Sequence, residues 1–511
     1  MTGPPKTLSD PGEGTAPLRL NRWWPLLVLL AIVPLLYPTV PPLTDLPAHM
    51  SRFMVQMDGG RTPELAQWYS FQWNLLPNLG TDLLIYALEP ALGLVPGVKT
   101  IVILIVALQT AGYLLLSRAA HGRVTATTLF ALPLAYGAPL QYGFLNFSLT
   151  TALATLSLAL WISQPMRARP ALRYGLFTVI ACVLWVGHLA GWAVFCVMVG
   201  SCELAARYVQ GRPFWKALSG GFLASSCLLI PQVLGMLWPN TPEHLPTHGF
   251  FRLGEKVYFL TNVLMDRWSP FDVVSAFVLA IMIAMTWRSK TGTVHQGLAL
   301  GAIVLFGLFW LLPGWVYGSY FADMRLTPTM FALALIAARP ELPRKQVRWL
   351  VLAGLAFFGL RLAGTTVSMA IWDKQFKREI AVLDALPHGS QLVSFRALPC
   401  RPFIFQSRLR DMHTASFALL RRHAFANDQF SMSGGQLLTI HNPAAAPFDR
   451  DPSSIEIGET CQGSVPVLDS TARIPAAIPY LWIVWHTPEL DVPGWKAVAR
   501  SGASVLYRRK R

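Results

Sequence analysis

Long apolar runs separated by short polar segments occupy the first 370 residues of the chain. About 20 consecutive apolar residues cross the roughly 30 Å hydrocarbon layer of a bilayer. The pattern therefore predicts a polytopic α-helical membrane protein. We expect about eleven transmembrane helices, at residues 23–43, 98–117, 124–140, 147–163, 173–187, 189–205, 215–238, 271–287, 295–314, 326–338 and 349–370.

The N-terminal residues precede the first apolar run and have a different composition. Residues 1–22, which open with "MTGPPKTLSDPGEGTAP", are predicted to form a disordered cytoplasmic leader. The apolar run after them is long and is not followed by a small-residue cleavage pattern, so we expect it to remain as the first span rather than to be removed as a signal peptide.

Basic residues indicate which side of the membrane each loop occupies. Cytoplasmic loops carry an excess of Lys and Arg, and in this scheme six basic clusters share one side: Arg19 and Arg22; Arg118 and Arg123; Arg167, Arg169 and Arg173; Arg207, Arg212 and Lys216; Arg288 and Lys290; Arg339, Arg344, Lys345 and Arg348. Topology thus accounts for the net charge of +16 without a nucleic-acid partner. We predict a bacterial inner-membrane protein with a cytoplasmic N-terminus.

The first outer loop, residues 44–97, contains a second apolar stretch. Residues 78–97 include Asp82, Glu89 and two prolines, so we expect a helix at the membrane edge. If this stretch instead crosses the membrane, every later loop changes sides. The basic clusters favour the first interpretation.

The transmembrane domain ends near residue 371, and residues 372–511 have a different pattern. A helix-like opening, "KQFKREIAVLDAL", is followed by the strand-like pieces "QLVSF", "YLWIVWHTP" and "SVLYRR". An odd number of spans places this tail outside the cytoplasm, as a small periplasmic α/β domain. Cys400 and Cys461 lie in it, and an oxidising compartment makes them candidates for a disulfide, with two unpaired thiols as the alternative.

Charged residues follow directly after the first span. Asp45, His49 and Arg52 are spaced by four and then three positions, so they share one face if residues 45–57 are helical. Pro47 suits the first turn of such a helix. The helix would then lie in the membrane interface plane with four apolar side chains against the bilayer: Leu46, Phe53, Met54 and Met57.

Other polar residues fall on the same side of the membrane. Together with His49 and Arg52 they are candidates for a substrate- or phosphate-binding cavity open to the outside and to lipid: Asn78, Asp82, Asn146, His188, Arg252, Asp323 and Arg325. Charged groups near a membrane are costly to keep unless they have a use.

Each candidate also has a structural interpretation. Asp45 could cap the following helix, and Asn78 and Asn146 could cap helices or close turns. Asp323 and Arg325 could pair with each other or anchor a helix end. A histidine at a helix end, such as His188, is often a satisfied interface residue.

Common soluble-enzyme motifs are missing from the sequence. It has no Walker loop, dinucleotide fingerprint, HExxH or nucleophile elbow, which disfavours ATP hydrolysis and hydride transfer. His49 with Asp45, or His244 with His248, has the spacing of two metal ligands on one helix face, but a third and a fourth ligand are not identifiable. No cofactor is expected, and a divalent metal stays open.

The segment "TDLPAH", with Asp45 a few positions after the first span, precedes membrane-edge helices, about a dozen spans and an outward soluble domain. This arrangement resembles the GT-C superfamily of integral membrane glycosyltransferases, which includes protein mannosyltransferases and aminoarabinose transferases. "DLPAHMSR" and "LPNLGTDLL" also resemble segments of uncharacterised bacterial polytopic membrane proteins.

The resemblance implies transfer of a sugar from a polyprenyl-phosphate carrier to an envelope acceptor on the outer side. Asp45 matches the family's acidic base, and Arg325, Arg52 and Arg252 are candidates to stabilise the leaving phosphate. Metal-dependent members have a second acidic residue after span three, which "GAPLQYGFLNFS" lacks. A metal-independent site or a non-catalytic relative is therefore implied.

Two other functions remain open. A transporter or flippase of an envelope precursor would use broken or charged helices, as Pro133, Pro231 and Arg361 suggest. A non-enzymatic envelope protein would bind a partner through its tail.

Overall fold

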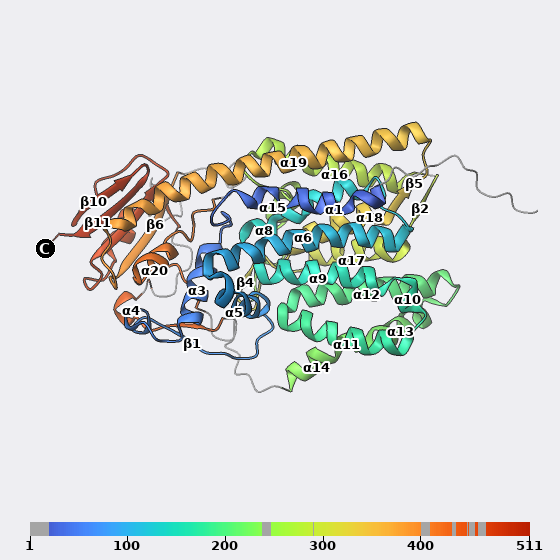
Figure 1. Cartoon of the computed structure of the whole chain (residues 1–511), viewed down its shortest axis with the longest axis horizontal. Coiled ribbons are helices and arrows are strands. Elements are labelled where there is room, and N and C mark those ends of the chain that lie inside the picture. Colours follow the sequence, from blue (N-terminus) through green and yellow to red (C-terminus); the bar gives the residue numbers. More distant parts are fainter. Residues whose placement is uncertain are drawn as a thin grey trace, which may run out of the picture.

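The structure, a computed structural model, describes residues 20–237, 247–289, 291–399, 409–431, 436–446, 448, 455–457 and 467–510. A helical bundle occupies one end of an elongated molecule and a small mixed sheet the other (Figure 1). The predicted leader lies almost entirely outside the described residues. So do Cys400 and Cys461, and therefore the predicted disulfide.

Six helical segments of the described chain are long and apolar enough to cross a membrane. They are α6 (Leu94–His121), α11 (Pro170–Gly187), α12 (Leu189–Val209), the run Phe214–Met236 formed by α13 (Phe214–Ser225), η2 (Ser226–Leu229) and α14 (Ile230–Met236), α16 (Ser269–Trp287), and α19 (Arg344–Glu379), which η4 (Ile380–Ala385) extends. Large apolar side chains such as Trp215 and Leu223 are exposed on this surface. Such a surface suits lipid rather than water.

Four further predicted spans are helical but shorter. They correspond to α1 (Leu20–Ala31) with α2 (Val33–Leu36), α9 (Leu145–Trp161), α17 (Gln296–Leu311), and η3 (Met324–Leu326) with α18 (Thr327–Ala337). Helices α9, α17 and α18 pack inside the bundle against longer helices. Apolar pattern therefore located these helices correctly, although their lengths fall below a full bilayer crossing.

The span predicted at 124–140 is wrong as a continuous helix. This segment is divided into α7 (Thr128–Ala131), η1 (Leu132–Tyr136) and α8 (Ala138–Tyr142). Pro133 lacks an N–H donor, and Gly137 has extended backbone geometry, so the α-helical ladder cannot continue. The segment is buried among other helices, which shields its irregular backbone from lipid.

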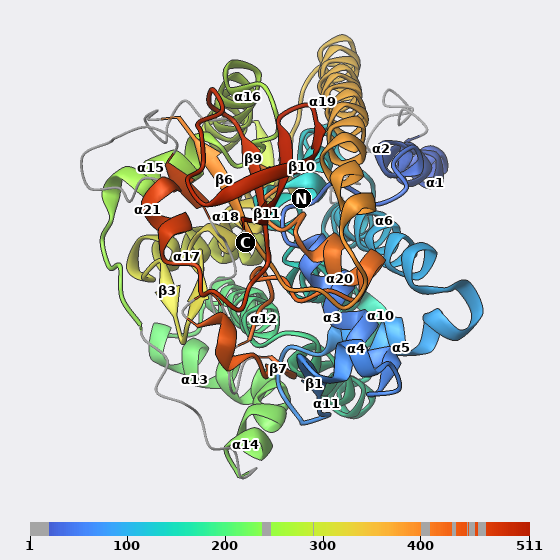
Figure 2. The same ribbon diagram turned by 90° about the vertical axis from the view of Figure 1, so that its left-hand side faces the viewer.

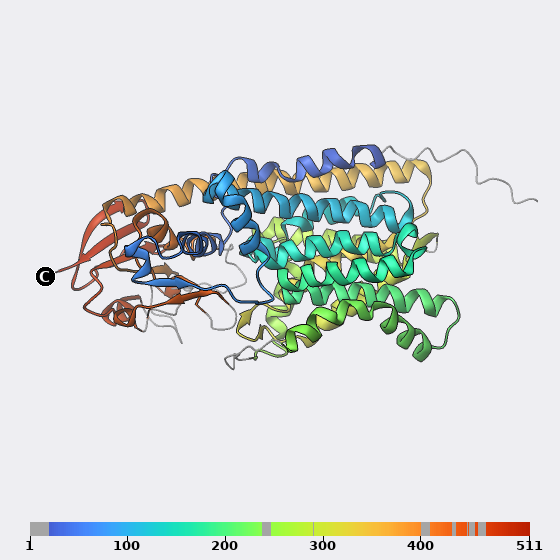
Figure 3. The same ribbon diagram turned by 60° about the horizontal axis from the view of Figure 1, so that its bottom comes forward.

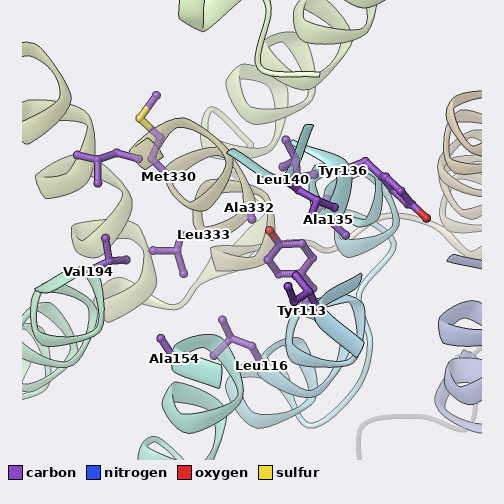
Figure 4. Packing of buried hydrophobic residues seen from close by; sticks show 14 of the residues in the cluster. Tyr113, Leu116, Ala135, Tyr136, Leu140, Ala154, Val194, Met330, Ala332 and Leu333 are labelled. Atoms are coloured by element: carbon purple, nitrogen blue, oxygen red, sulfur yellow. The ribbon is translucent and has the colours of Figure 1, made fainter. Parts of the chain in front are cut away.

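Apolar side chains of this segment form part of the bundle core. In Figure 4, Ala135, Tyr136 and Leu140 lie in one cluster with side chains of α6 and α18, such as Tyr113 and Met330. The Tyr136 hydroxyl donates to the backbone carbonyl of Ala31 over 2.7 Å. The broken segment is therefore held in place by packing and by a bond to α1.

Elements that carry the basic clusters gather at the end of the bundle opposite the sheet. There β2 (Gly292–Val294) pairs with β5 (Ala338–Pro340), and α10 (Gln164–Arg167) and the start of α13 lie at the same end (Figure 1). Glu203, near the end of α12, pairs with Arg173 and Arg207. The described clusters thus share one end of the molecule, as the sequence predicts.

The segment predicted to be the first outer loop, residues 44–97, lies at the other end of the bundle, next to the sheet (Figures 1 and 3). It contains α3 (Leu46–Asp58), α4 (Pro63–Ala66), β1 (Tyr69–Phe71) and α5 (Gly80–Leu92). Helix α5 has 13 residues, which span about 20 Å at 1.5 Å per residue and so fall short of a bilayer. Gly93, with φ of 79°, separates it from α6.

The predicted helix 45–57 exists, but its expected contact with lipid is wrong. Leu46 and Phe53 are completely buried by protein, and α3 packs against α6 and against α20 (Ser416–Arg422). Leu46 and Phe53 belong to the core of the bundle, while Met54 packs, half-buried, against the core of the C-terminal domain. A single helical period cannot distinguish a lipid-facing side from one that faces another domain.

The C-terminal sheet has the strand order β10-β11-β9-β6-β8. Strand β6 runs parallel to β8 and β9, while β11 is antiparallel to β9 and β10. The strands are β6 (Leu392–Leu398), β8 (Ile455–Ile457), β9 (Tyr480–Trp485), β10 (Trp495–Ser501) and β11 (Ser504–Arg509), accompanied by α20, η6 (Pro443–Ala445) and α21 (Val467–Ala472). Figure 2 looks onto this sheet with the helices behind it. The predicted strand-like pieces form β6, β9 and β11.

Two connections tie the bundle to the sheet domain. Helix α19 runs without a break from the bundle into the domain, where Trp372 and Phe376 join the domain core, so the predicted boundary at residue 371 falls inside one helix. Strand β1 of the first outer loop pairs with β7 (Leu438–Ile440) of the domain.

Candidate functional site

Asp45 lies at the N-terminus of α3, but its side chain does not cap that helix. The carboxylate makes no capping hydrogen bond, and the backbone carbonyl of Asp45 instead accepts the His49 N–H over 3.0 Å. The Asp45 N–H donates to the Tyr142 carbonyl over 2.8 Å. The capping interpretation of Asp45 is therefore wrong, and its side chain is 13% exposed.

Gly143 allows the α8–α9 turn to approach Asp45 closely. Its φ of +92° is strained for residues with a side chain, and a Cβ there would lie 2.9 Å from the Asp45 nitrogen and 3.1 Å from the Asp45 Cβ. Only glycine fits between the turn and α3. The sequence motif that seats Asp45 thus includes "YGF" as well as "TDLPAH".

A histidine of the C-terminal domain faces the Asp45 carboxylate. His413 Nε2 lies 3.6 Å from Asp45 Oδ1, and the His413 side chain is 3% exposed. The ring of Phe430 lies against His413, with centroids 4.9 Å apart. Sequence reasoning missed His413, because nothing in the local pattern of the tail indicates which residue meets the first outer loop.

His49 lies beside this pair and is held neutral. Burial lowers its pKa well below the usual range, and the charges of Arg52 and His413 lower that pKa further. The ring hydrogen-bonds to the backbone of Gly143 and packs 5.8 Å from the Phe430 centroid. A neutral His49 can orient neighbouring groups but supplies no positive charge for a phosphate.

Arg52 and Asp82, two predicted phosphate-binding residues, are occupied with each other. Arg52 Nη1 lies 2.9 Å from Asp82 Oδ1, both side chains are buried, and Arg52 also donates to Gln436 Oε1 over 2.9 Å. The pair links α3 to α5. The pair therefore has a structural role, and phosphate binding by these two residues stays a prediction.

Asn78 and Asn146 also join elements. The Asn146 Oδ1 accepts bonds from the backbone N–H and the hydroxyl of Thr81, at 2.5 and 2.7 Å. Its Nδ2 donates to the backbone carbonyl of Asn78 over 2.7 Å. Asn146 thus satisfies the first turn of α5 from α9, which is the capping interpretation that the sequence left open.

Arg325 lies in η3, buried in the bundle at the end that faces the sheet domain. It donates to Ser319 Oγ over 2.8 Å and to the Tyr320 carbonyl over 3.2 Å, and its Nη1 lies 3.2 Å from His188 Nε2. Asp45 attracts it electrostatically. Among the described residues no carboxylate lies within 4 Å of Arg325, so its hydrogen-bond partners here are neutral.

His188 connects Arg325 to the α11–α12 junction. Its Nδ1 lies 3.1 Å from the Ala190 N–H, at the start of α12. Both the Ala190 N–H and the Arg325 guanidinium are donors, so a neutral ring can accept from only one of them at a time. His188 therefore helps to place Arg325, a role that the sequence analysis did not assign to it.

Asp323 and Arg252 belong to other contacts. Asp323 Oδ2 accepts from Lys256 Nζ over 2.7 Å in a buried pair, and Oδ1 accepts the Met324 N–H over 2.8 Å. The suggested pairing of Asp323 with Arg325 is therefore wrong. Arg252 is half exposed and pairs with Glu255 over 2.8 Å. Neither residue joins the cluster around Asp45.

A small polar cavity of about 30 Å³ adjoins Arg325 inside the bundle. Its polar lining includes Gln109, Ser148 and Thr151, and both Ser148 Oγ and Arg325 Nε are buried without a hydrogen-bond partner. The volume suits about one water molecule. The cavity gives the guanidinium a polar surrounding on the bundle side.

Metal ligands do not cluster in the described part of the chain, which holds no group of three or more His, Cys, Asp and Glu side chains placed to bind an ion. His244, one of the residues considered for a metal, lies outside the described residues.

Comparisons with family models, with curated proteins and with solved structures find no match for this chain.

Proposed function

We propose that the chain is a membrane glycosyltransferase that moves a sugar from a polyprenyl-phosphate carrier to an envelope acceptor, with Asp45 as general base. One observation carries the proposal. A carboxylate that does not cap its helix lies at the junction of the bundle and the sheet domain, within the electrostatic reach of a buried arginine whose hydrogen-bond partners are neutral.

The proposed reaction uses two charged groups: the Asp45 carboxylate acts on the acceptor, and the Arg325 guanidinium acts on the leaving phosphate. The acceptor hydroxyl gives its proton to Asp45 as its oxygen bonds to the sugar carbon, and the bond from that carbon to the carrier phosphate breaks. The negative charge that remains on the carrier phosphate is stabilised by the Arg325 guanidinium, whose planar fork suits phosphate oxygens. A buried arginine without a carboxylate in contact is suited to this task.

The position of the site supports a lipid-linked donor on the outer side. Arg325 lies at the end of a bundle whose surface is apolar enough to meet lipid, so a phosphate could reach it while its prenyl chain stays in the bilayer. The basic clusters lie at the opposite end, which the positive-inside rule assigns to the cytoplasm. The sheet domain and Asp45 are then periplasmic.

Sugar transfer by the purified protein in nanodiscs tests the proposal. We would supply a panel of polyprenyl-phosphate sugars with envelope acceptors and measure carrier release for the wild type, Asp45→Asn and Asp384→Asn. Asp45→Asn should lose at least about 100-fold in turnover, the scale of a general base, while the protein still folds because the carboxylate is not a cap. Asp384, 73% exposed, provides the matched control.

Two outcomes would contradict this proposal. Full turnover in Asp45→Asn would remove the base from the mechanism. A folded wild type that turns over none of the donors would favour the alternative below.

Transport of an envelope precursor is the second candidate. The broken segment α7–η1–α8 and the buried pair of Arg361 with Asp272, 2.6 Å apart, provide the interrupted backbone and intramembrane charge that transporters use. Movement of a labelled carrier across proteoliposomes without sugar transfer would support it.

A further inference from the structure

The backbone around His413 restricts the protonation of its ring. His413 Nδ1 lies 3.1 Å from the backbone carbonyl of Asp428, which can only accept a hydrogen bond, so Nδ1 carries a proton. The other nitrogen, Nε2, is the one that faces Asp45 Oδ1 at 3.6 Å. If Nε2 were unprotonated, its lone pair would face a carboxylate, so a second proton on the ring is favoured.

We propose that His413 is a positioning residue for Asp45: its imidazolium holds the Asp45 carboxylate ionised and in place, so that the site is complete only when the C-terminal domain is seated on the bundle. The role of Asp45 as base comes from the proposed function, on which this inference rests. The pairing of the two side chains can be tested without it.

His413 is fixed in the position that this role needs. The preceding Arg410 donates to the Pro42 carbonyl over 2.7 Å and pairs with Asp266 of the bundle. Asp411 accepts from His486 over 2.7 Å, which ties the same loop to the end of β9. The loop is thus anchored to the bundle on one side and to the sheet on the other, and the ring between these anchors has little freedom to move.

Among the described residues, the Asp45 carboxylate is the one paired with the His413 ring. From α3, His49 is neutral and Arg52 is paired with Asp82. On the bundle side, Arg325 attracts Asp45 itself.

From the segment after α20, Asp428 presents a backbone carbonyl to the ring, while its carboxyl accepts bonds from the Ser416 N–H at 2.6 Å and from Gln429 Nε2 at 3.2 Å. Burial raises the pKa of that carboxyl to about 7. The Asp428 carboxyl is thus held by other donors, while Nε2 of His413 faces Asp45.

The pairing has a defined effect on the reaction. His413 keeps its two ring protons throughout, and the proton of the acceptor goes to Asp45. The imidazolium is present at pH values below its own pKa and is lost as the pH rises through that pKa. Activity should therefore decline at alkaline pH because the His413 imidazolium loses its proton there.

A titration of the full-length protein tests the pairing without any substrate. We would label histidines with ¹⁵N, assign His413 from the signal that His413→Gln lacks, and follow both ring nitrogens in the wild type and in Asp45→Asn. The His413 midpoint should fall by about one pH unit or more when the facing carboxylate becomes an amide, and the neutral ring should keep its proton on Nδ1. An unchanged midpoint would overturn the proposal. His388, which is exposed, should titrate alike in both proteins.

Kinetics test the consequence for catalysis. With a donor that the wild type uses, His413→Gln should lower kcat about tenfold, leave the KM for the donor unchanged because Arg325 is intact, and remove the alkaline decline. His388→Gln should match the wild type. A wild-type kcat and pH profile in a folded His413→Gln would contradict the positioning role. If no donor is used at all, glycosyl transfer fails as the function, and the titration still decides whether the two side chains pair.

Discussion

At the scale of single residues, the candidate site depends on a few side chains whose roles the sequence could not rank. Asp45, Arg325 and His188 come together at the junction with the sheet domain, while Arg52 and Asp323 are used in ion pairs elsewhere. Residue type alone does not separate these outcomes, because a buried Arg or Asp is equally suited to a ligand or to a partner.

Replacing Gly143 with alanine should displace Asp45. The new Cβ would meet the Asp45 backbone and would also adopt φ of +92°. Gly122→Ala provides the control, because its φ is +71° but nothing lies within 4 Å of its Cβ. Both variants should lose about 1–2 kcal/mol of stability for the left-handed backbone, but only Gly143→Ala should also lose sugar transfer. Equal activity in the two variants would show that the Asp45 position is not critical.

The buried carboxyl of Asp428 should make stability depend on pH. Burial raises its pKa from 3.8 to about 7 in the folded protein. The folded state therefore binds more protons than the unfolded state between these values, and stability should fall as the pH rises from about 4 to about 7. We would measure the melting temperatures of the wild type and Asp428→Asn across this pH range. The difference between the two melting temperatures should change with pH. The difference in melting temperature between the wild type and Asp384→Asn should stay constant.

At the scale of elements, the sequence pattern predicted where the helices form better than it predicted what they pack against. Apolar length located all six long helices, and short strand-like pieces of the tail located β6, β9 and β11. It failed at 124–140, where Pro133 and Gly137 interrupt an apolar run. It also failed on the environment of α3, because Leu46 and Phe53 are buried in the bundle core and are not exposed to lipid.

The Arg52–Asp82 pair should couple α3 to α5. Arg52→Met leaves a buried carboxylate without its partner and should lower the free energy of unfolding by about 3–5 kcal/mol. The double variant Arg52→Met/Asp82→Leu removes both charges and should be more stable than Arg52→Met alone. Reversible unfolding in detergent, monitored by tryptophan fluorescence, would give the free energies of unfolding of the wild type, the two single variants and the double variant. A double variant that loses the sum of the two single effects would indicate that the pair is not coupled.

At the scale of the whole molecule, α19 and the β1–β7 pairing join a bundle with apolar helices of membrane-spanning length to a sheet domain, and the candidate site lies where they meet. The basic ends of the bundle helices lie on the far side. This arrangement makes the orientation in the membrane testable at two exposed positions.

An impermeant maleimide should distinguish the two ends of the molecule. In a background without the native cysteines, Asp384→Cys should be labelled in intact bacterial spheroplasts, and Ala168→Cys, next to α10, only after permeabilisation. The reverse pattern would place the sheet domain in the cytoplasm and would contradict an outward site.

The sequence by itself determined where the long apolar helices and the main strands form, and it placed the basic clusters at one end, because these depend on local composition and period. Only the tertiary structure decided that Asp45 does not cap its helix, that Arg52 pairs with Asp82, and that His413 faces Asp45. These contacts join residues that are far apart in the chain. Which partner satisfies a buried charge depends on how the elements pack, and the local pattern does not encode that choice.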